Sequence, residues 1–185
     1  MHPKIHAKNN PNKPAYIMAS SNEVVTYKEL NDYSNQIANF FRKKGLLPGD
    51  HIAIFMENNT IFTKILWAAQ RSGLYYTPIS SRLTASEVDY IIRDCGAKLV
   101  ITSIHLKHVV SDLGKLIKDI PDRYIVNGNC EGWENFEQNI TNMPILPIED
   151  EIMGQDMLYS SGTTGKPKGI KLPLKNIPVE QSEDL

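Results

Sequence analysis

The part of the sequence best suited to chemistry is residues 159–169, which hold three glycines, four Ser or Thr hydroxyls and two lysines. Glycine allows positive φ and lets a backbone approach a ligand closely, while amides and hydroxyls donate hydrogen bonds to phosphate oxygens. Lysine adds a mobile positive charge. The segment therefore has the composition of a polyphosphate-binding loop. A surface hairpin rich in Gly, Ser and Thr would share that composition.

The pair Gly165-Lys166 raises the possibility of a Walker A motif, which needs a Gly five residues before the pair and a Ser or Thr after the Lys. Those two positions are Ser160 and Pro167 in this sequence. Proline has no hydroxyl to place on Mg²⁺. A P-loop NTPase is therefore a poor explanation of the loop.

Helix patterns alternate with short apolar runs ahead of the loop. Thr26 with Glu29, and Thr84 with Glu87, have the Ser/Thr-x-x-Glu form of a capping box, so a helix is expected after each. A further helix is expected from residue 59 or 60. Glycines near the ends of these helices predict helix termination. The expected strands and their flanking glycines follow in chain order: Gly45, strand 51–56, Gly73, strand 74–79, Gly96, strand 99–102.

The second half of the sequence is less regular. A weaker helix is expected over residues 105–120 and a strand over 124–126, whereas residues 127–142 are irregular, with at most a short helix at 133–138. Pro144 and Pro147 indicate an extended linker. Strands at 156–159 and 169–172 should flank the loop. Strands alternating with helices predict an α/β fold, with a mostly parallel sheet flanked by helices.

Length and composition exclude several function classes. The 185 residues, 41% hydrophobic and 22% charged, suit one globular domain. A net charge of -1 gives no broad field to attract nucleic acid or an anionic membrane. No apolar run is long enough to span a bilayer or form a signal peptide, so no integral membrane protein is expected. The two cysteines, Cys95 and Cys130, form no Cys-x-x-Cys pair, which favours a cytoplasmic location.

In residue order, the segment 159–169 resembles without interruption the signature loop of the adenylate-forming, or AMP-binding, superfamily. That family contains acyl-CoA ligases, peptide-synthetase adenylation domains and luciferases. Residues 25–30, 46–53, 69–79 and 84–102 are similar to further stretches of the family. The resemblance implies that residues 1–185 are a partial N-terminal AMP-binding domain that ends just after the loop.

The resemblance also implies an activity. A carboxylate, with a fatty acid as the expected substrate, would react with ATP and Mg²⁺ to give an acyl-adenylate. Coenzyme A would then displace AMP. Thr164 and Lys168 are implied to assist the departing pyrophosphate, while Lys166 is left out because the family pattern tolerates any residue there. The residues implied to bind the β- and γ-phosphates are Ser160, Ser161, Gly162, Thr163, Thr164, Gly165 and Lys168.

Members of the family are longer, and their residues for adenine, ribose and thioester formation follow the loop. The chain is therefore expected to be incomplete and not to turn over alone, and its open strand edges predict self-association as a homo-oligomer. Two alternatives stay open. One is a catalytically inert nucleotide-binding or assembly module of the same fold, and the other is a fragment of a peptide-synthetase adenylation domain.

Other residues that might carry chemistry have simpler interpretations. His51, His105 and His108 lack a Cys or carboxylate at metal-ligand spacing, so they are expected to be surface or packing residues. Trp67 is expected in the core, because it lies among apolar residues at helical spacing. Cys95, which precedes Gly96, is expected at a buried helix end.

Overall fold

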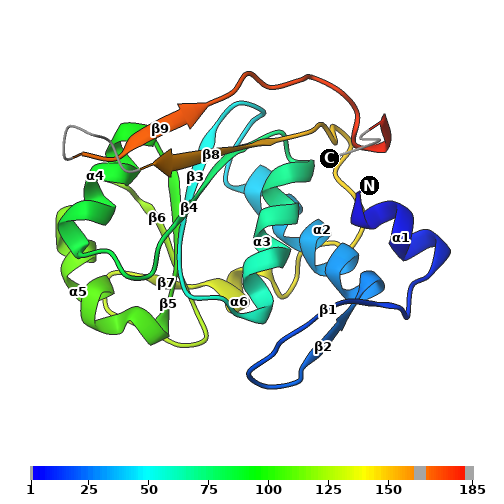
Figure 1. Cartoon of the computed structure of the whole chain (residues 1–185), viewed down its shortest axis with the longest axis horizontal. Helices are drawn as coiled ribbons and strands as arrows, with labels where there is room; N and C mark the ends of the chain where they lie inside the picture. Colours follow the sequence, from blue (N-terminus) through cyan, green and yellow to red (C-terminus); the bar gives the residue numbers. More distant parts are fainter. Residues whose placement is uncertain (1, 161–165, 182–185) are drawn as a thin grey trace.

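The computed structural model describes residues 2–160 and 166–181, and its main feature is a seven-stranded sheet in the order β7-β6-β5-β3-β4-β8-β9 (Figure 1). Every pairing in this sheet is parallel except that of β8 with β9. The predicted α/β fold with a mostly parallel sheet is confirmed. The strands are β3 (His51–Phe55), β4 (Tyr75–Ile79), β5 (Leu99–Ser103), β6 (Asp122–Val126), β7 (Glu134–Asn135), β8 (Gln155–Ser160) and β9 (Lys168–Lys171).

Helices cover both faces of the sheet. The three on one face are α2 (Tyr27–Lys43), α3 (Thr60–Arg71) and α6 (Phe136–Ile140). Those on the other face are α4 (Ala85–Cys95) and α5 (Lys107–Leu116), the latter preceded by a 3₁₀ turn, η1 (Ile104–Leu106). The two groups lie on opposite sides of the strands in Figure 1.

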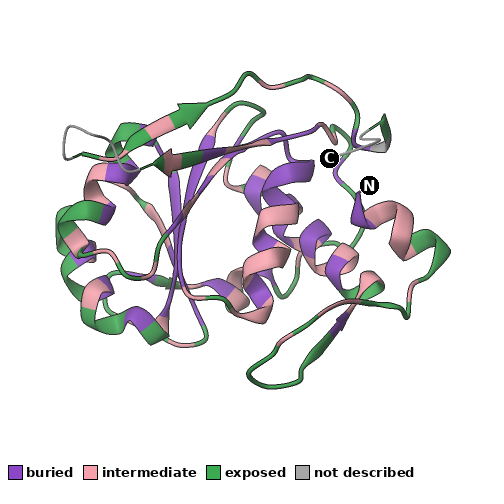
Figure 2. Ribbon diagram, in the orientation of Figure 1, coloured by how far each residue is buried: buried purple, intermediate pink, exposed green. Residues whose placement is uncertain are grey.

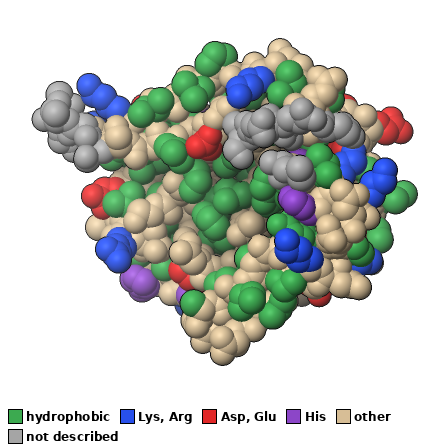
Figure 3. Space-filling view, turned by 45° about the vertical axis from the view of Figure 1, so that its right-hand side comes forward, with side chains coloured by type: hydrophobic (Ala, Val, Ile, Leu, Met, Phe, Trp, Pro, Cys, Tyr) green, Lys and Arg blue, Asp and Glu red, His purple; other side chains and the backbone are tan. Residues whose placement is uncertain are grey.

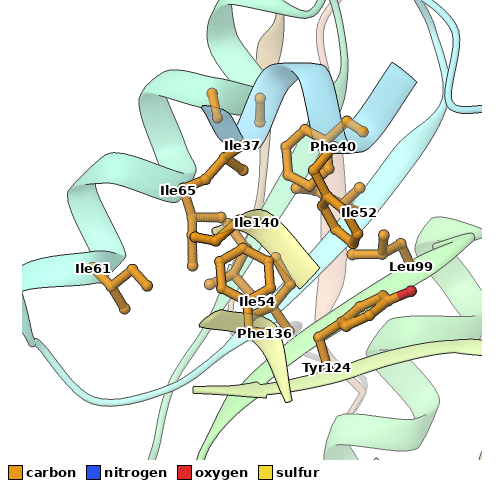
Figure 4. Packing of buried hydrophobic residues seen from close by; sticks show 14 of the residues in the cluster. Ile37, Phe40, Ile52, Ile54, Ile61, Ile65, Leu99, Tyr124, Phe136 and Ile140 are labelled. Atoms are coloured by element: carbon orange, nitrogen blue, oxygen red, sulfur yellow. The ribbon is translucent and has the colours of Figure 1, made fainter. Parts of the chain in front are cut away.

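Alternation along the central strands produces two apolar cores. Ile52 and Ile54 of β3 point toward α2 and α3, whereas Ala53 and Phe55 point toward α4. All four are fully buried, as expected for a parallel strand covered on both sides, and Figure 2 shows the central strands as almost continuously buried. In the first core, shown in Figure 4, the rings of Phe40, Tyr124 and Phe136 lie near one another edge to face.

The predicted helix ends are present. The capping boxes at Thr26 and Thr84 both form, and the Asn59 side chain accepts hydrogen bonds from the first turn of α3. Helix α4 ends at Cys95, which is buried as predicted, and Gly96 follows with φ 69°. A left-handed residue at this position suits glycine, because it has no Cβ to clash.

Several elements differ from the sequence predictions. The helix α1 (Pro3–Asn9) and the hairpin of β1 (Pro14–Ile17) with β2 (Val24–Thr26) had no predicted counterpart. The segment 127–142, predicted to be irregular with at most a short helix at 133–138, forms a short helix, α6, close to that position, and also the edge strand β7, which was not predicted. A final 3₁₀ turn, η2 (Val179–Gln181), follows the sheet.

The aromatic and histidine side chains also have definite positions. Trp67 is half-buried and lies edge-on against His2, with ring centroids 5.0 Å apart, so it lies at the margin of the core rather than inside it. His51 is a packing residue and is buried, while His105 and His108 are exposed. Among the described residues, no helix combines the length and hydropathy that crossing a bilayer requires.

The segment that leads into β8 is fixed by buried polar contacts. Glu151 accepts from Lys4 Nζ at 2.7 Å, and its other carboxylate oxygen lies 3.4 Å from Nε of the fully buried Arg71. The amide of Gly154 donates to the Gln70 carbonyl at 2.6 Å. The start of β8 is therefore held against the end of α3 by main-chain and ionic contacts.

Candidate functional site

The candidate site lies on the antiparallel hairpin of β8 and β9. Their register pairs Met157 with Lys171, and the last pair before the connection is Ser160 with Lys168. Both residues of that last pair are exposed. The structure therefore brings together two of the predicted phosphate-binding residues. The other five, Ser161, Gly162, Thr163, Thr164 and Gly165, lie outside the described residues.

The hairpin leaves the sheet at its carboxyl edge. β8 runs parallel to β4, so Ser160 lies at the carboxyl end of its strand. Ligands of open α/β sheets bind outside the carboxyl ends of the strands, where the connecting loops gather. The location of the predicted loop is consistent with a ligand-binding role.

The main-chain pairing of β8 with β4 is short. Only Gln155 and Asp156 have register partners on β4, and from Met157 onward the strand pairs with β9 alone. At Met157 a side-chain hydrogen bond links the two strands instead, because the Thr77 hydroxyl of β4 donates to the Met157 carbonyl at 3.0 Å. His51 Nε2 lies 2.8 Å from the same hydroxyl oxygen. Since the hydroxyl proton is used on Met157, His51 Nε2 is the donor to Thr77.

The two faces of the hairpin differ. Met157 and Tyr159 point inward and pack against the core beneath α4. Because cross-strand partners share a face, Ser160 and Lys168 project outward. Gly169 lies opposite Tyr159, and a Cβ at Gly169 would lie 2.9 Å from Tyr159 Cζ. The inner face therefore has no room for a side chain at residue 169.

Helix α4 contacts the hairpin on both sides of residues 161–165. The Tyr159 hydroxyl donates to Asp94 Oδ2 at 2.6 Å, and the Tyr90 hydroxyl donates to the Pro167 carbonyl at 3.3 Å. Lys166 Nζ also lies over the Tyr90 ring, 5.2 Å from its centroid. Burial, and then the hydrogen bond to Asp94, raise the pKa of Tyr159, so the phenol stays protonated and donates.

Sequence reasoning did not identify Tyr90 and Asp94. Both lie on α4, 65 or more residues before the loop in sequence, and only their spacing of four residues, which places two polar side chains on one helix face, could have suggested a shared contact. The helix position alone gives no indication of which strand lies beside it.

The end of the hairpin remote from residues 161–165 contacts β4. The Tyr75 hydroxyl donates to the Leu172 carbonyl at 2.8 Å, and Lys171 Nζ lies over the same ring, 4.2 Å from its centroid. Lys171 is also near His51. Burial, with a smaller contribution from that positive charge, lowers the pKa of His51 to about 4. His51 is therefore neutral at physiological pH and acts as a hydrogen-bond donor.

The carboxyl edge of the sheet also carries a cavity. This cavity of about 310 Å³ lies at the ends of β3 and β4, and its lining combines apolar residues, including Phe62 and Ile79, with polar residues, including Ser80 and Ser81. Figure 3 shows hydrophobic side chains gathered near the middle of one molecular face, with charged side chains scattered around them. No group of three or more His, Cys, Asp or Glu side chains within residues 2–160 and 166–181 is arranged to hold a metal ion.

Comparison with known proteins identifies the family. A family model described as "AMP-binding enzyme" matches residues 4–182, which is almost the whole chain and includes the β8–β9 hairpin. This chain belongs to the AMP-binding enzyme family. The resemblance found in residues 159–169 is thereby confirmed.

Several curated relatives are similar at about 30% identity. A fatty acid–[acyl-carrier-protein] ligase, ScoC, of Streptomyces coeruleorubidus is 32% identical over 90% of this chain and 31% of its own length. The long-chain-fatty-acid–CoA ligase FadD13 of Mycobacterium tuberculosis is 29% identical over 87% of this chain and 32% of its own. Bacitracin synthase 2 of Bacillus licheniformis is 30% identical over 92% of this chain and 6% of its own. The chain thus spans about a third, or less, of each of these relatives.

Solved structures share the fold. The N-terminal domain of FACL13 from Mycobacterium tuberculosis, bound to an inhibitor, has a TM-score of 0.73 at 26% identity and covers 91% of this chain and 42% of the other. The anthranilate CoA ligase AuaEII, in complex with anthranoyl-AMP, has a TM-score of 0.76 at 23% identity and covers 91% of this chain and 33% of the other. The fold of this chain is that of the N-terminal region of adenylate-forming ligases.

Proposed function

We propose that this chain is the N-terminal part of an adenylate-forming acyl-CoA ligase and that its β8–β9 hairpin binds the phosphates of ATP. The observation that carries the proposal is the hairpin itself. It presents Ser160 and Lys168 side by side at the carboxyl edge of the sheet, at the ends of a segment rich in Gly, Ser and Thr. The names of ScoC and FadD13 support carboxylate activation as the chemistry.

The proposed reaction has two steps. A carboxylate oxygen attacks the α-phosphorus of ATP, and the bond from that phosphorus to the oxygen bridging to the β-phosphorus breaks, giving acyl-adenylate and pyrophosphate. The sulfur of coenzyme A then attacks the acyl carbon. The carbon–oxygen bond to AMP breaks, the thiol proton is released, and the thioester forms. Activation divides one difficult substitution into two easier ones.

The hairpin residues would act in the first step. Negative charge accumulates on the pyrophosphate as it leaves, and a lysine and oriented donors that face this charge stabilise the transition state. Lys168 would supply the charge, while Ser160, with Ser161, Gly162, Thr163, Thr164 and Gly165, would supply hydrogen-bond donors. Mg²⁺ would arrive with the phosphates of ATP, since triphosphates are normally bound as their magnesium complexes.

The proposed carboxylate is a fatty acid and the proposed thiol is coenzyme A, a combination supported by the name of FadD13. ScoC would favour a carrier-protein thiol instead, and bacitracin synthase 2 favours a peptide-synthetase adenylation domain as a second candidate. A cytoplasmic location belongs to the same proposal, and the two free cysteines, Cys95 and Cys130, support it.

Exchange of labelled pyrophosphate into ATP tests the proposal directly. The polypeptide that contains this chain together with the rest of the ligase would be incubated with ATP, labelled pyrophosphate and one carboxylate at a time. Octanoate and palmitate represent fatty acids, and phenylalanine and ornithine represent peptide-synthetase substrates. Exchange that depends on a fatty acid is expected. Exchange that depends only on an amino acid would favour the second candidate, and no exchange with any carboxylate would indicate an inert module.

A further inference from the structure

Helix α4 contacts the chain immediately before and immediately after residues 161–165. On the first side, Tyr159 donates to Asp94 Oδ2 at 2.6 Å. On the second side, Pro167 accepts from the Tyr90 hydroxyl at 3.3 Å, and Lys166 lies over the Tyr90 ring. One helix face therefore contacts both ends of the predicted phosphate loop.

The helix that makes these contacts is itself firmly placed. Tyr90 and Asp94 are four residues apart, so they lie one above the other on the same face of α4. The opposite face carries Val88, Ile91 and Ile92, which are buried in the core beneath the sheet. Movement of Tyr90 or Asp94 away from the hairpin would require that buried face to move as well.

The sheet does not hold this part of the hairpin by main-chain bonds. β8 has register partners on β4 only at Gln155 and Asp156. Beyond them, β8 and β9 pair with each other, and the pair projects from the sheet over α4. The position of Ser160 and Lys168 relative to the sheet therefore depends on side-chain contacts, and the two made by α4 are at Tyr159 and Pro167, next to the loop ends.

We propose that Tyr90 and Asp94, the α4 clamp, are positioning residues that fix the two ends of the phosphate loop. Neither residue is assigned contact with a substrate. The α4 clamp sets where Ser160 and Lys168 stand, and a site whose groups are already in place binds and stabilises charge better than one that must be ordered first. The effect on the nucleotide rests on the function proposed above, whereas the clamping itself does not.

Trypsin provides a test of the clamping in the full chain. The Lys168–Gly169 bond is open to trypsin when β9 separates from its neighbours, whereas Lys166 is protected by Pro167. Under native conditions, cleavage at Lys168 reports local opening of the hairpin. Tyr159→Phe, Asp94→Ala and Tyr90→Leu are expected to raise the rate of this cleavage by about threefold to tenfold. A change of this size corresponds to the loss of one ordinary hydrogen bond or one ring contact, and Asp94 is exposed to solvent, which weakens its bond.

Three controls separate positioning from general loss of structure. Tyr124→Phe removes a hydroxyl that donates to Asp122 at 2.9 Å, on β6 and facing the other core, so it is the same chemical change away from the hairpin. It should leave the cleavage rate at the parental value. Asp94→Asn keeps an acceptor oxygen and should recover most of the protection that Asp94→Ala loses. The double variant Asp94→Ala with Tyr159→Phe should be no faster than either single variant, because both remove the same contact.

A second measurement connects the α4 clamp to the nucleotide. In the complete ligase, Asp94→Ala and Tyr90→Leu are expected to weaken ATP binding about threefold to tenfold without a change in the thermal unfolding midpoint. Cleavage at the parental rate in both Asp94→Ala and Tyr90→Leu would overturn the α4 clamp. If cleavage accelerates but ATP affinity is unchanged in these variants, and pyrophosphate exchange is also unchanged in Lys168→Ala, the clamp stands and the assignment of the loop to phosphate is wrong.

Discussion

At the level of single residues, the hairpin separates the groups that would bind a ligand from those that hold it in place. Ser160 and Lys168 share the outer face, whereas Tyr159 points inward, toward α4. Gly169 permits this arrangement, because a Cβ there would crowd Met157 Cε and would lie 2.9 Å from Tyr159 Cζ. The alternation of a β-strand thus places the charged residue toward solvent and its support toward the core.

Lys168→Ala is expected to lower the rate of pyrophosphate exchange in the complete ligase by about tenfold or more, which corresponds to about 1.4 kcal/mol in the barrier. The charge acts on the departing pyrophosphate, so the loss should fall on the adenylation rate more than on the affinity for ATP. Thioester formation from pre-made acyl-adenylate should be spared. Lys115→Ala, on the exposed side of α5, is the control. Exchange within about twofold of the parent would contradict the role given to Lys168.

His51 predicts a stability that depends on pH. Burial lowers its pKa in the folded protein from 6.5 to about 4. Between those values the unfolded chain binds a proton that the folded chain does not, so stability rises with pH and is lost as pH falls from 6.5 toward 4. His2, whose pKa is lowered to about 3 mainly by burial, acts in the same direction. The slope has an upper limit of about 1.4 kcal/mol per pH unit for each histidine.

Urea unfolding at pH 7.0, 5.5 and 4.5 would measure this dependence. His51→Gln removes the titrating ring but keeps an amide that can donate to Thr77, so its free energy of unfolding should fall less than that of the parent at pH 4.5. His108→Gln, at an exposed position of α5, should follow the parent. If the free energy of unfolding of His51→Gln depends on pH in the same way as that of the parent, His51 does not contribute to the pH dependence of stability.

At the level of elements, the sequence predicted those helices and strands for which the apolar pattern and the capping or terminating residues indicate the same element. The strand at residues 51–55 is apolar after His51, and the helix after Thr84 has both a capping box and a terminal glycine, so each was predicted with bounds close to those observed. The edge strand β7 is two residues long, and its formation depends on pairing with β6. No local pattern specifies such a strand.

The candidate site, too, could be predicted from the sequence only in part. Composition and order within residues 159–169 predicted a loop between two strands, and the register of Ser160 with Lys168 agrees with it. The support from Tyr90 and Asp94 depends on a parallel sheet that brings α4 beside a hairpin far along the chain. Tertiary contacts of this kind have no period or spacing in the sequence.

Gly154→Ala tests how tightly β8 is placed. A Cβ at this position would lie 2.5 Å from the Leu74 carbonyl oxygen and 2.7 Å from that of Ala69, and both are main-chain atoms of packed elements. The substitution should lower the free energy of unfolding by about 2 to 4 kcal/mol, because the backbone must shift. Gly45→Ala is the comparison, since it has φ 77° but open space around the Cβ and should cost only about 1 kcal/mol. Equal losses in the two variants would mean that the close approach at Gly154 is easily relieved.

At the level of the whole molecule, the chain has two closed cores but only part of what its relatives contain. ScoC and FadD13 are about three times as long as the matched region. We therefore expect that these 185 residues alone make no acyl-CoA from ATP, coenzyme A and palmitate. FadD13 assayed beside it is the positive control. Thioester formed above the level seen without enzyme would show that the 185 residues contain a complete site.

The outer surface of the hairpin predicts how the isolated chain behaves in solution. Leu158, Ile170 and Leu172 are 50%, 56% and 54% exposed, and Leu158 and Ile170 are directly opposite each other on β8 and β9. Adjacent exposed apolar side chains on an edge hairpin favour association, because contact with another chain removes them from water. Lys168 and Lys171 oppose pairing of β9 with a second copy of itself, since an antiparallel pair centred on this strand would place like charges opposite each other. Association is therefore expected through the apolar face rather than through the strand edge.

Light scattering at micromolar concentration should detect species larger than the 20.9 kDa monomer. The double substitution of Leu158→Ser with Ile170→Ser should shift the population toward monomer, because it removes the opposed apolar pair while leaving the inward residues Met157 and Tyr159 unchanged. Leu47→Ser is the matched control, since Leu47 is 61% exposed and belongs to the turn before β3, not to the hairpin. A monomeric parent would refute self-association, and an equal effect of Leu47→Ser would mean that association depends on total exposed apolar surface and not on this face.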